Sequence, residues 1–234
     1  MQSRVPYGSA VPITPGVRAG NRPGPKPRLT REEIVEAAVE VGVERLSVGA
    51  VAERLGVAPG TLYRYVDGLE EIAAAAVALV FARTPLPDPA HGWRPFLEEE
   101  AELAFDLLLR YSGLIQDLGA DLSAVAGDRL RRIVGALHDA GFGPTAAVRV
   151  ADAVLDVVAD GAHQTRWVRG PGGGPGDLSD PARAYLDSLD GAVREQVRGI
   201  MTGPRDHVLD KVALLLDGVE LRRAAGREGY AGIR

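Results

Sequence analysis

Apolar residues recur at helical spacing along most of the chain from residue 30 onward. Two short helices begin the pattern, with apolar faces made of Ile34, Ala37, Ala38 and Val41 and then of Val48, Val51, Ala52 and Leu55. Similar spacing predicts further helices over 59–66, 69–83, 93–111, 122–140, 145–168, 181–201 and 206–225. No alternating run of β-branched residues bounded by turns occurs, so the sequence predicts an all-α protein.

Capping residues set the bounds of the first helices. Thr30 and Glu33 form a capping box, and Ser47 is a good N-cap for the second helix. Gly56 ends that helix, and after a turn of about three residues Pro59 suits the first turn of the third. Residues 47–66 therefore predict a helix-turn-helix.

Changes in composition divide the chain. Residues 1–28 are rich in Pro, Gly, Arg and Ser without periodicity, which predicts a disordered basic arm. Prolines and a glycine between 84 and 92 predict a linker. The predicted units are thus the arm, a helix-turn-helix domain with its connecting helix over 29–83, the linker 84–92, a helical domain over 93–225 and a flexible tail over 226–234.

Composition excludes several classes of protein. The chain has 234 residues, 46% hydrophobic and 25% charged, and no cysteine. The lack of cysteine removes disulfides, thiolate zinc sites and cysteine nucleophiles. The longest nearly pure apolar run, 72–82, is short for a membrane span, and the N-terminus has no apolar signal-peptide core. We therefore expect a cytoplasmic protein.

Charge is distributed unevenly along the chain. Its formal net charge is −5, yet residues 1–31 carry six basic residues and no acid, so the other 203 residues carry −11. Lys26 and Arg28 lie in a proline-spaced stretch that can follow a phosphate backbone or a minor groove. An inert extension explains residues 1–20 equally well.

The third predicted helix has the residues that a DNA-reading helix needs. Leu62 and Val66 lie one turn apart and can anchor it, whereas Thr61, Arg64 and Tyr65 share a polar face without acids. Hydroxyl and guanidinium donors suit phosphates and base edges. The alternative is a helical hairpin that never contacts DNA, in which Tyr63 is a core residue.

Two stretches resemble the N-terminal domain of TetR-family transcriptional repressors. They are Leu29-Thr-Arg-Glu-Glu-Ile-Val-Glu-Ala-Ala and Leu46-Ser-Val-Gly-Ala-Val-Ala-Glu-Arg-Leu-Gly-Val-Ala-Pro-Gly-Thr-Leu-Tyr-Arg-Tyr-Val, within residues 28–83. The resemblance implies a homodimer that binds a palindromic DNA operator, and a C-terminal helical domain whose small-molecule inducer releases the DNA. By position it implies DNA contacts at Ser47, Val48, Pro59, Gly60, Thr61, Tyr63, Arg64 and Tyr65. The chain departs from many members at two positions. They carry a basic residue where this chain has Gly49, and a lysine where it has Leu69.

The second domain offers weaker signals. The helix predicted over 206–225 has an apolar stripe of Val208, Val212, Leu215, Leu216 and Val219. The resemblance implies that it pairs with 145–168 in a four-helix dimer interface, while an ordinary core-facing helix explains the stripe equally well. Polar and aromatic side chains that can line an inducer pocket are Trp93, Phe96, Phe105, Tyr111, His163, Gln164 and Trp167, although aromatic residues at helical spacing are more often core.

Other chemistry has little support in the sequence. Asp152, Asp156 and Asp160 recur every four residues, and we favour a solvated face over a cation or metal site. No phosphate loop or nucleophile elbow occurs, and the four histidines are scattered, so we predict no enzyme, metal or cofactor. The sequence thus favours a ligand-responsive repressor. The alternative is a helical module that binds small molecules or proteins and has lost DNA binding.

Overall fold

The computed structural model describes residues 29–42, 45–117, 123–227 and 229–230, with no strand among them. The prediction of an all-α protein is therefore confirmed. The helices are α1 (Arg31–Val41), α2 (Val48–Leu55), α3 (Pro59–Leu62), α4 (Leu69–Arg83), α5 (Trp93–Asp117), α6 (Ser123–Asp139), α7 (Pro144–Arg169), α8 (Asp180–Asp187), α9 (Gly191–Thr202) and α10 (Pro204–Ala224), with a short 3-10 helix, Pro89–His91, before α5.

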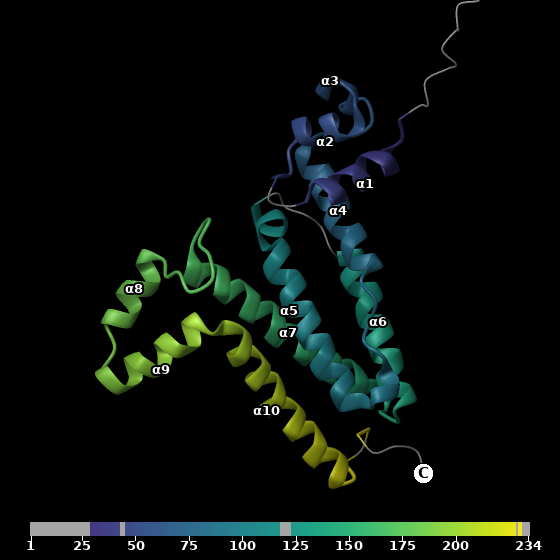
Figure 1. Ribbon diagram of the computed structural model, residues 1–234. Coiled ribbons are helices and arrows are strands. Elements are labelled where there is room, and N and C mark those ends of the chain that lie inside the picture. Colours follow the sequence, from purple (N-terminus) through teal and green to yellow (C-terminus); the bar gives the residue numbers. More distant parts are fainter. Residues whose placement is uncertain (1–28, 43–44, 118–122, 228, 231–234) are drawn as a thin grey trace, which may run out of the picture.

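The helices form a small head and a longer body (Figure 1). α1, α2 and α3 surround the start of α4, which leads from the head to the body. In the body α7 packs against α5, α6 and α10, and α10 also packs against α5. α8 and α9 project beyond these helices (Figure 1). In the described part of the chain no helix is long and apolar enough to cross a membrane.

The predicted caps define the head helices. The Thr30 hydroxyl accepts a hydrogen bond from the Glu33 N–H (3.1 Å), and the Glu33 carboxylate accepts one from the Thr30 N–H (2.9 Å). The Ser47 hydroxyl accepts from the N–H of Ala50, and Gly56 ends α2 with φ at +65°, a left-handed conformation that suits glycine. The helices enclose a core of Ile34, Ala37, Ala38, Val51, Ala52, Leu62, Val66, Ile72 and Ala76.

The body core takes in the stripe predicted on the last helix. Val208, Val212, Leu216 and Val219 are buried within the same chain. At the crossing of α7 and α10, a Cβ on Gly161 would lie 2.2 Å from Cγ2 of Val208, so the crossing requires glycine. Within the described chain, most of this stripe therefore faces the core.

A buried ion pair joins α5 and α6. The Arg129 guanidinium donates to both carboxylate oxygens of Glu100, from Nε at 2.5 Å and Nη2 at 2.7 Å. Glu100 is fully buried and Arg129 is 8% exposed. Nη1 of Arg129 also donates to the carbonyl of Thr84, the C-cap of α4, at 3.4 Å. One side chain thus connects α6, α5 and the end of the helix that leads to the head.

Three predicted helices have different bounds in the structure. The helix predicted over 59–66 ends at Leu62, and residues 63–65 form a turn across which the N–H groups of Tyr65 and Val66 donate to the Leu62 carbonyl. The helix predicted over 93–111 extends to Asp117. The helix predicted over 181–201 is broken, since α8 ends at Asp187 and α9 begins at Gly191.

A side chain explains the break between α8 and α9. The Arg194 guanidinium donates to the carbonyls of Asp187 (2.9 Å) and Leu189 (3.0 Å), which satisfies acceptors at the end of α8. The Ser188 hydroxyl donates to the Tyr185 carbonyl at 2.6 Å. These bonds stabilise a turn where apolar spacing alone predicts a continuous helix.

Two residues of the predicted flexible tail, Gly229 and Tyr230, pack on the body. Tyr230 is 9% exposed and its ring lies edge-on to Phe142, with centroids 6.4 Å apart. The Gly143 N–H donates to the Gly229 carbonyl at 2.7 Å. Burial of the aromatic ring therefore fixes this part of the tail on the body, while residues 228 and 231–234 lie outside the described residues.

Candidate functional site

The α2–turn–α3 unit presents a fixed surface at the tip of the head. The Val57 N–H donates to the Ala52 carbonyl at 3.0 Å, which sets the turn after α2. Pro59 occupies the first turn of α3, where its missing N–H costs nothing. Leu62 and Val66 are buried, so the anchoring role predicted for them is confirmed.

Polar and aromatic residues of this unit face outward. Tyr63 is 58% exposed, which excludes the interpretation that it is a core residue. Arg64 is also exposed, whereas Tyr65 is half-buried and packs against the head core. Of the other predicted contacts, Ser47, Pro59 and Gly60 are exposed, and Val48 and Thr61 are half-buried. All eight therefore lie between positions 47 and 65, and two of them, Val48 and Tyr65, pack partly against the head core.

Ion pairs hold the head helices in place behind this surface. The Glu71 carboxylate accepts from the Asp67 N–H (2.7 Å) and from Arg31 Nε (2.8 Å), and these bonds lower the pKa of Glu71. Glu36 accepts from Arg83 Nη1 at 2.7 Å, and this pairing lowers the pKa of Glu36. Both carboxylates connect α1 to the α4 region. The position of the outward face is thus set by the core and by these links.

The two departures from the family pattern lie at the edge of the same surface. Gly49 is exposed in the first turn of α2, and a Cβ at this position would have the Ser47 hydroxyl oxygen, 4.0 Å away, as its nearest neighbour. Leu69 is half-buried at the start of α4. Lys26 and Arg28, the predicted basic contacts, lie outside the described residues.

The aromatic residues predicted for a ligand pocket have several environments. Phe96 and Phe105 are buried core residues, each 1% exposed. Trp93 packs edge-on against Phe142, with ring centroids 5.3 Å apart. Tyr111 borders a small cavity of about 50 Å³ between α1, α4 and α5. The structure therefore does not bring these four side chains together in one pocket.

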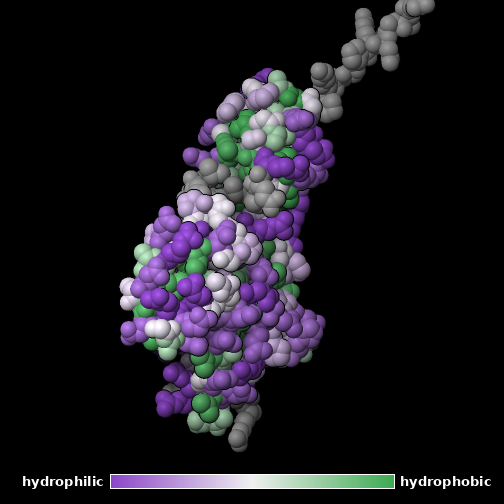
Figure 2. Space-filling model, turned by 60° about the vertical axis from the view of Figure 1, so that its left-hand side comes forward, coloured by the Kyte–Doolittle hydropathy of each residue, from purple (hydrophilic) through white to green (hydrophobic). Residues whose placement is uncertain are grey.

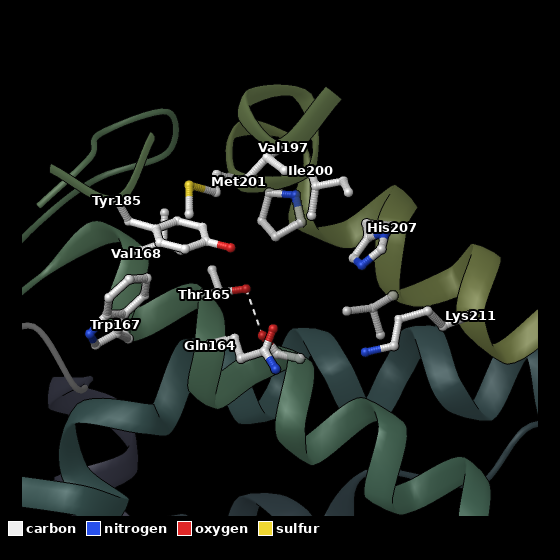
Figure 3. A pocket seen from close by; sticks show the side chains of 13 residues that line it. Gln164, Thr165, Trp167, Val168, Tyr185, Val197, Ile200, Met201, His207 and Lys211 are labelled. Atoms are coloured by element: carbon white, nitrogen blue, oxygen red, sulfur yellow. Dashed lines mark hydrogen bonds between the residues drawn. The ribbon is translucent and has the colours of Figure 1, made fainter. Parts of the chain in front are cut away.

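An apolar groove lies between α7, α8, α9 and α10 (Figure 3). It has a volume of about 290 Å³ and includes two of the predicted ligand residues, Gln164 and Trp167, while His163 borders a neighbouring hollow. Its lining residues are Gly161, Gln164, Thr165, Trp167, Val168, Tyr185, Val197, Ile200, Met201, Pro204, His207, Val208 and Lys211.

The groove has distinct ends. Trp167 and Tyr185 lie at one end, and His207 and Lys211 lie toward the other (Figure 3). Gln164 donates to Asp160 at 2.7 Å, and Lys211 Nζ lies 3.8 Å from the same carboxylate. The polar groups along the floor therefore already have partners, and the remaining surface is mainly apolar.

Sequence reasoning missed several groove residues. Tyr185 and Ile200 come from α8 and α9, which the sequence predicted as one continuous helix, and Lys211 comes from α10. Asp152, Asp156 and Asp160 are exposed, in agreement with the solvated face that the sequence favoured. The described residues contain no group of three side chains that could hold a metal ion.

Comparisons with known proteins identify a family for the head and relatives of the chain. Residues 31–76 match the family model described as bacterial regulatory proteins, tetR family. The HTH-type transcriptional repressor DrrR1 of Streptomyces coeruleorubidus is 40% identical over 107 residues, which are 42% of this chain. The matched region spans only 39% of that relative's length. The family model thus places the similarity in the head, within α1 to α4.

Solved structures extend the comparison to the body. A possible TetR family transcriptional regulator from Streptomyces coelicolor A3(2) has a TM-score of 0.58 at 20% identity, covering 82% of this chain and 100% of its own. The Q116A variant of TetR from Acinetobacter baumannii AYE, in complex with minocycline, has a TM-score of 0.52 at 21% identity, covering 83% and 98%. At these identities the likeness shows a shared fold of head and helical body.

Proposed function

Because the chain belongs to the tetR family of bacterial regulatory proteins, we propose that it is a repressor that binds a palindromic operator as a homodimer and leaves it when a small molecule binds. We assign DNA reading to residues 29–83 and ligand response and dimerisation to residues 93–225, with 84–92 as the linker. A two-fold dimer suits this role because its two heads can reach the two half-sites of a palindrome.

The observation that carries the proposal is the exposed, acid-free stretch that begins after Glu53 and includes the turn and α3. No acidic residue occurs between positions 54 and 66, and Tyr63 and Arg64 are exposed beside the buried Leu62. A surface that approaches phosphates must lack carboxylates, whereas a surface selected only for stability need not.

We assign separate roles along this surface. Ser47 and Val48, at the start of α2, contact the phosphate backbone, and Tyr63 donates its hydroxyl to a phosphate. Thr61 and Arg64 face base edges in the major groove, where Pro59 and Gly60 let the backbone approach closely. Tyr65 contributes less of its side chain because it packs partly inside. Lys26 and Arg28 add phosphate or minor-groove contacts.

The response to a small molecule is supported by the family. The TetR variant from Acinetobacter baumannii AYE is bound to minocycline, and it shares the helical body of this chain. Of the predicted ligand residues, Gln164, Trp167 and Tyr111 border cavities in the structure, whereas Phe96 and Phe105 would meet a ligand only if the core opened.

A gel-shift titration of the full chain tests DNA binding. The DNA is the intergenic segment beside its own gene, with a scrambled segment as control, at about 50 and 200 mM salt. We expect a specific shift that weakens steeply with salt. No shift at the lower salt would favour the alternative, a helical binding module that has lost DNA binding.

Two substitutions test the roles of the surface residues. Thr61→Ala should cost about 1–3 kcal/mol at one base position. Tyr63→Phe should weaken binding to all sequences alike, by about 1.5–3 kcal/mol for a hydrogen bond to a charged phosphate. Tyr185→Phe, at a similarly exposed tyrosine (48%) far from the head, is the matched control. Equal and negligible effects of Thr61→Ala and Tyr63→Phe would contradict the assignment.

A further inference from the structure

Two aromatic side chains of the groove remain exposed, although the groove is built from four helices. Trp167 on α7 is 49% exposed, Tyr185 on α8 is 48% exposed, and Ile200 on α9 is 40% exposed. Figure 2, which brings the side with α8 and α9 forward, shows green apolar patches among the purple polar residues. Aromatic rings that line a concave apolar site can stack on a flat ligand in offset or edge-on arrangements.

Hydrogen bonds fix the wall that carries these two rings. The Ser179 N–H donates to the Val168 carbonyl at 2.6 Å, and the Ser179 hydroxyl donates to the Trp167 carbonyl at 3.0 Å. Ser179 is also the N-cap of α8, so these bonds hold α8 against the end of α7. Bonds from Arg194 to two backbone carbonyls hold the turn between α8 and α9. The groove is therefore pre-formed, which lowers the entropic cost of binding.

The opposite end of the groove offers hydrogen-bond donors. Nζ of Lys211 lies 3.8 Å from the Asp160 carboxylate, too far for a hydrogen bond, so the donors of this ammonium remain available. Asp160 accepts from Gln164 Nε2 at 2.7 Å and keeps this partner when Lys211 turns away. His207 lies one helical turn before Lys211 on α10 and lines the same end (Figure 3). This end therefore suits an anion, with Asp160 as the charge that opposes it.

The size and the floor of the groove limit the ligand further. The volume of about 290 Å³ is near the lower bound, about 300 Å³, of pockets that take drug-sized molecules. One or two fused rings suit such a volume better than a larger ring system. The buried Thr165 hydroxyl on the floor already donates to the Gly161 carbonyl at 2.7 Å, so the floor favours apolar atoms.

We infer that the groove binds a flat aromatic acid of one or two rings. The ring packs at the end with Trp167 and Tyr185, and its carboxylate accepts hydrogen bonds from Lys211 and His207. This inference rests on the proposed ligand response and specifies both the site and the chemical class of the ligand. A neutral aromatic molecule contacts the same walls but gains no charge-assisted hydrogen bond from Lys211, so charge sets the preference.

Calorimetric titrations of the full chain with three probes test this preference. Naphthoate has both the ring and the charge, naphthamide keeps the ring without the charge, and cyclohexanecarboxylate keeps the charge without the aromatic ring. We expect naphthoate to bind at least about tenfold more tightly than either of the others. Equal dissociation constants for naphthoate and naphthamide, or no binding of naphthoate up to about 5 mM, would overturn the inference.

Substitutions at the polar end test the individual contacts. Lys211→Met removes the ammonium and should weaken naphthoate at least about tenfold while naphthamide stays within about twofold. Asp160→Asn removes the opposing charge and should tighten naphthoate, an effect that a purely structural role of Asp160 would not produce. Arg131→Met, at an exposed arginine on α6, is the matched control and should leave both constants unchanged. Circular dichroism and thermal melting check that each variant folds.

The indole N–H signals in a nitrogen–proton correlation spectrum locate the bound probe, because the chain has two tryptophans. Trp93 packs edge-on against Phe142 in the body, and the variant Trp93→Phe identifies its signal. Naphthoate should shift the Trp167 signal and leave the Trp93 signal unchanged. A shift of the Trp93 signal alone would place the probe outside the groove and overturn the inference.

The outcomes separate this inference from the proposal beneath it, because the titrations contain no DNA. A chain that binds naphthoate in the groove but never shifts the intergenic DNA would overturn the repressor and leave the groove site standing. A chain that shifts the DNA but does not bind naphthoate would overturn the groove site alone. Equal weakening of naphthoate and naphthamide by Lys211→Met would overturn the assigned role of the charge.

Discussion

Replacing Arg129 with methionine tests the buried ion pair between α5 and α6. Methionine keeps much of the side-chain volume but removes both hydrogen bonds to Glu100, the 2.5 Å and 2.7 Å contacts. Glu100 is fully buried, so its carboxylate would be left without its counter-ion in the interior. Removing one partner of a buried pair costs about 3–5 kcal/mol, and we expect a loss of that size at about pH 7 to 8.

The loss should depend on pH because burial raises the pKa of Glu100, even though Arg129 opposes the shift. Without Arg129 the pKa rises further. An acid whose folded-state pKa exceeds its unfolded value stabilises the fold below the unfolded pKa, and this stabilisation is lost as the pH rises through the folded pKa. The cost of Arg129→Met should therefore be smallest near the ordinary pKa of a glutamate, about 4.3, and largest above the folded pKa.

Urea unfolding at several pH values, at one protein concentration, measures these costs. Arg131→Met, at an exposed arginine two positions along α6, is the control and should stay within about 0.5 kcal/mol of the wild type. The double variant Glu100→Leu/Arg129→Met should recover most of the stability and lose the pH dependence, because an apolar pair needs no counter-ion. A cost of Arg129→Met below about 1 kcal/mol, or equal at all pH values, would refute the reasoning.

Three further predictions concern other parts of the chain. Gly49→Lys, at an exposed position with space for a side chain, should strengthen operator binding and steepen the salt dependence of the binding constant by a slope of about 1. Gel shifts at several salt concentrations measure this slope, and Gly135→Lys in the body should leave it unchanged. Gly161→Ala should lower the urea midpoint of unfolding because the added Cβ would overlap Val208. Gly135→Ala is the control: its Cβ meets nothing within 4 Å and alanine forms helices better than glycine, so the free energy of unfolding should rise by up to about 1 kcal/mol. Deleting residues 1–28, which include Lys26 and Arg28, should weaken operator binding and reduce the salt slope by at least about 1, and an unchanged slope would mean that the segment does not contact DNA.

The head could be predicted from the sequence because its signals are local. The capping box at Thr30, the cap at Ser47 and the stop at Gly56 each depend on residues within a few positions, and each occurs in the structure as predicted. The end of α3 could not be predicted in this way. A turn replaces the helix from Tyr63 to Tyr65, although the apolar spacing of Leu62 and Val66 continues across that turn.

The body was harder to predict because its signals depend on distant partners. Periodicity identified the apolar stripe on α10 but not what it contacts, and Val208 and Val212 prove to face the chain's own core. Leu214 and Leu221 lie outside that stripe and became notable only when their exposure was known. The pairing of Glu100 with Arg129 joins residues 29 positions apart, which no local pattern could match.

The position of Arg129 connects the stability of the body to the placement of the head. α4 contributes Ile72 and Ala76 to the head core, and its C-cap Thr84 accepts a hydrogen bond from Arg129 in the body. At 3.4 Å this bond is long and weak, whereas the two bonds from Arg129 to Glu100 are short and buried. If α6 is displaced, the weak bond from Arg129 to the Thr84 carbonyl should therefore break first. The short bonds to Glu100 should persist, so that α5 moves together with α6. In Arg129→Met both connections are lost, so protection of the α4 amides against hydrogen exchange should fall in this variant and stay unchanged in Arg131→Met.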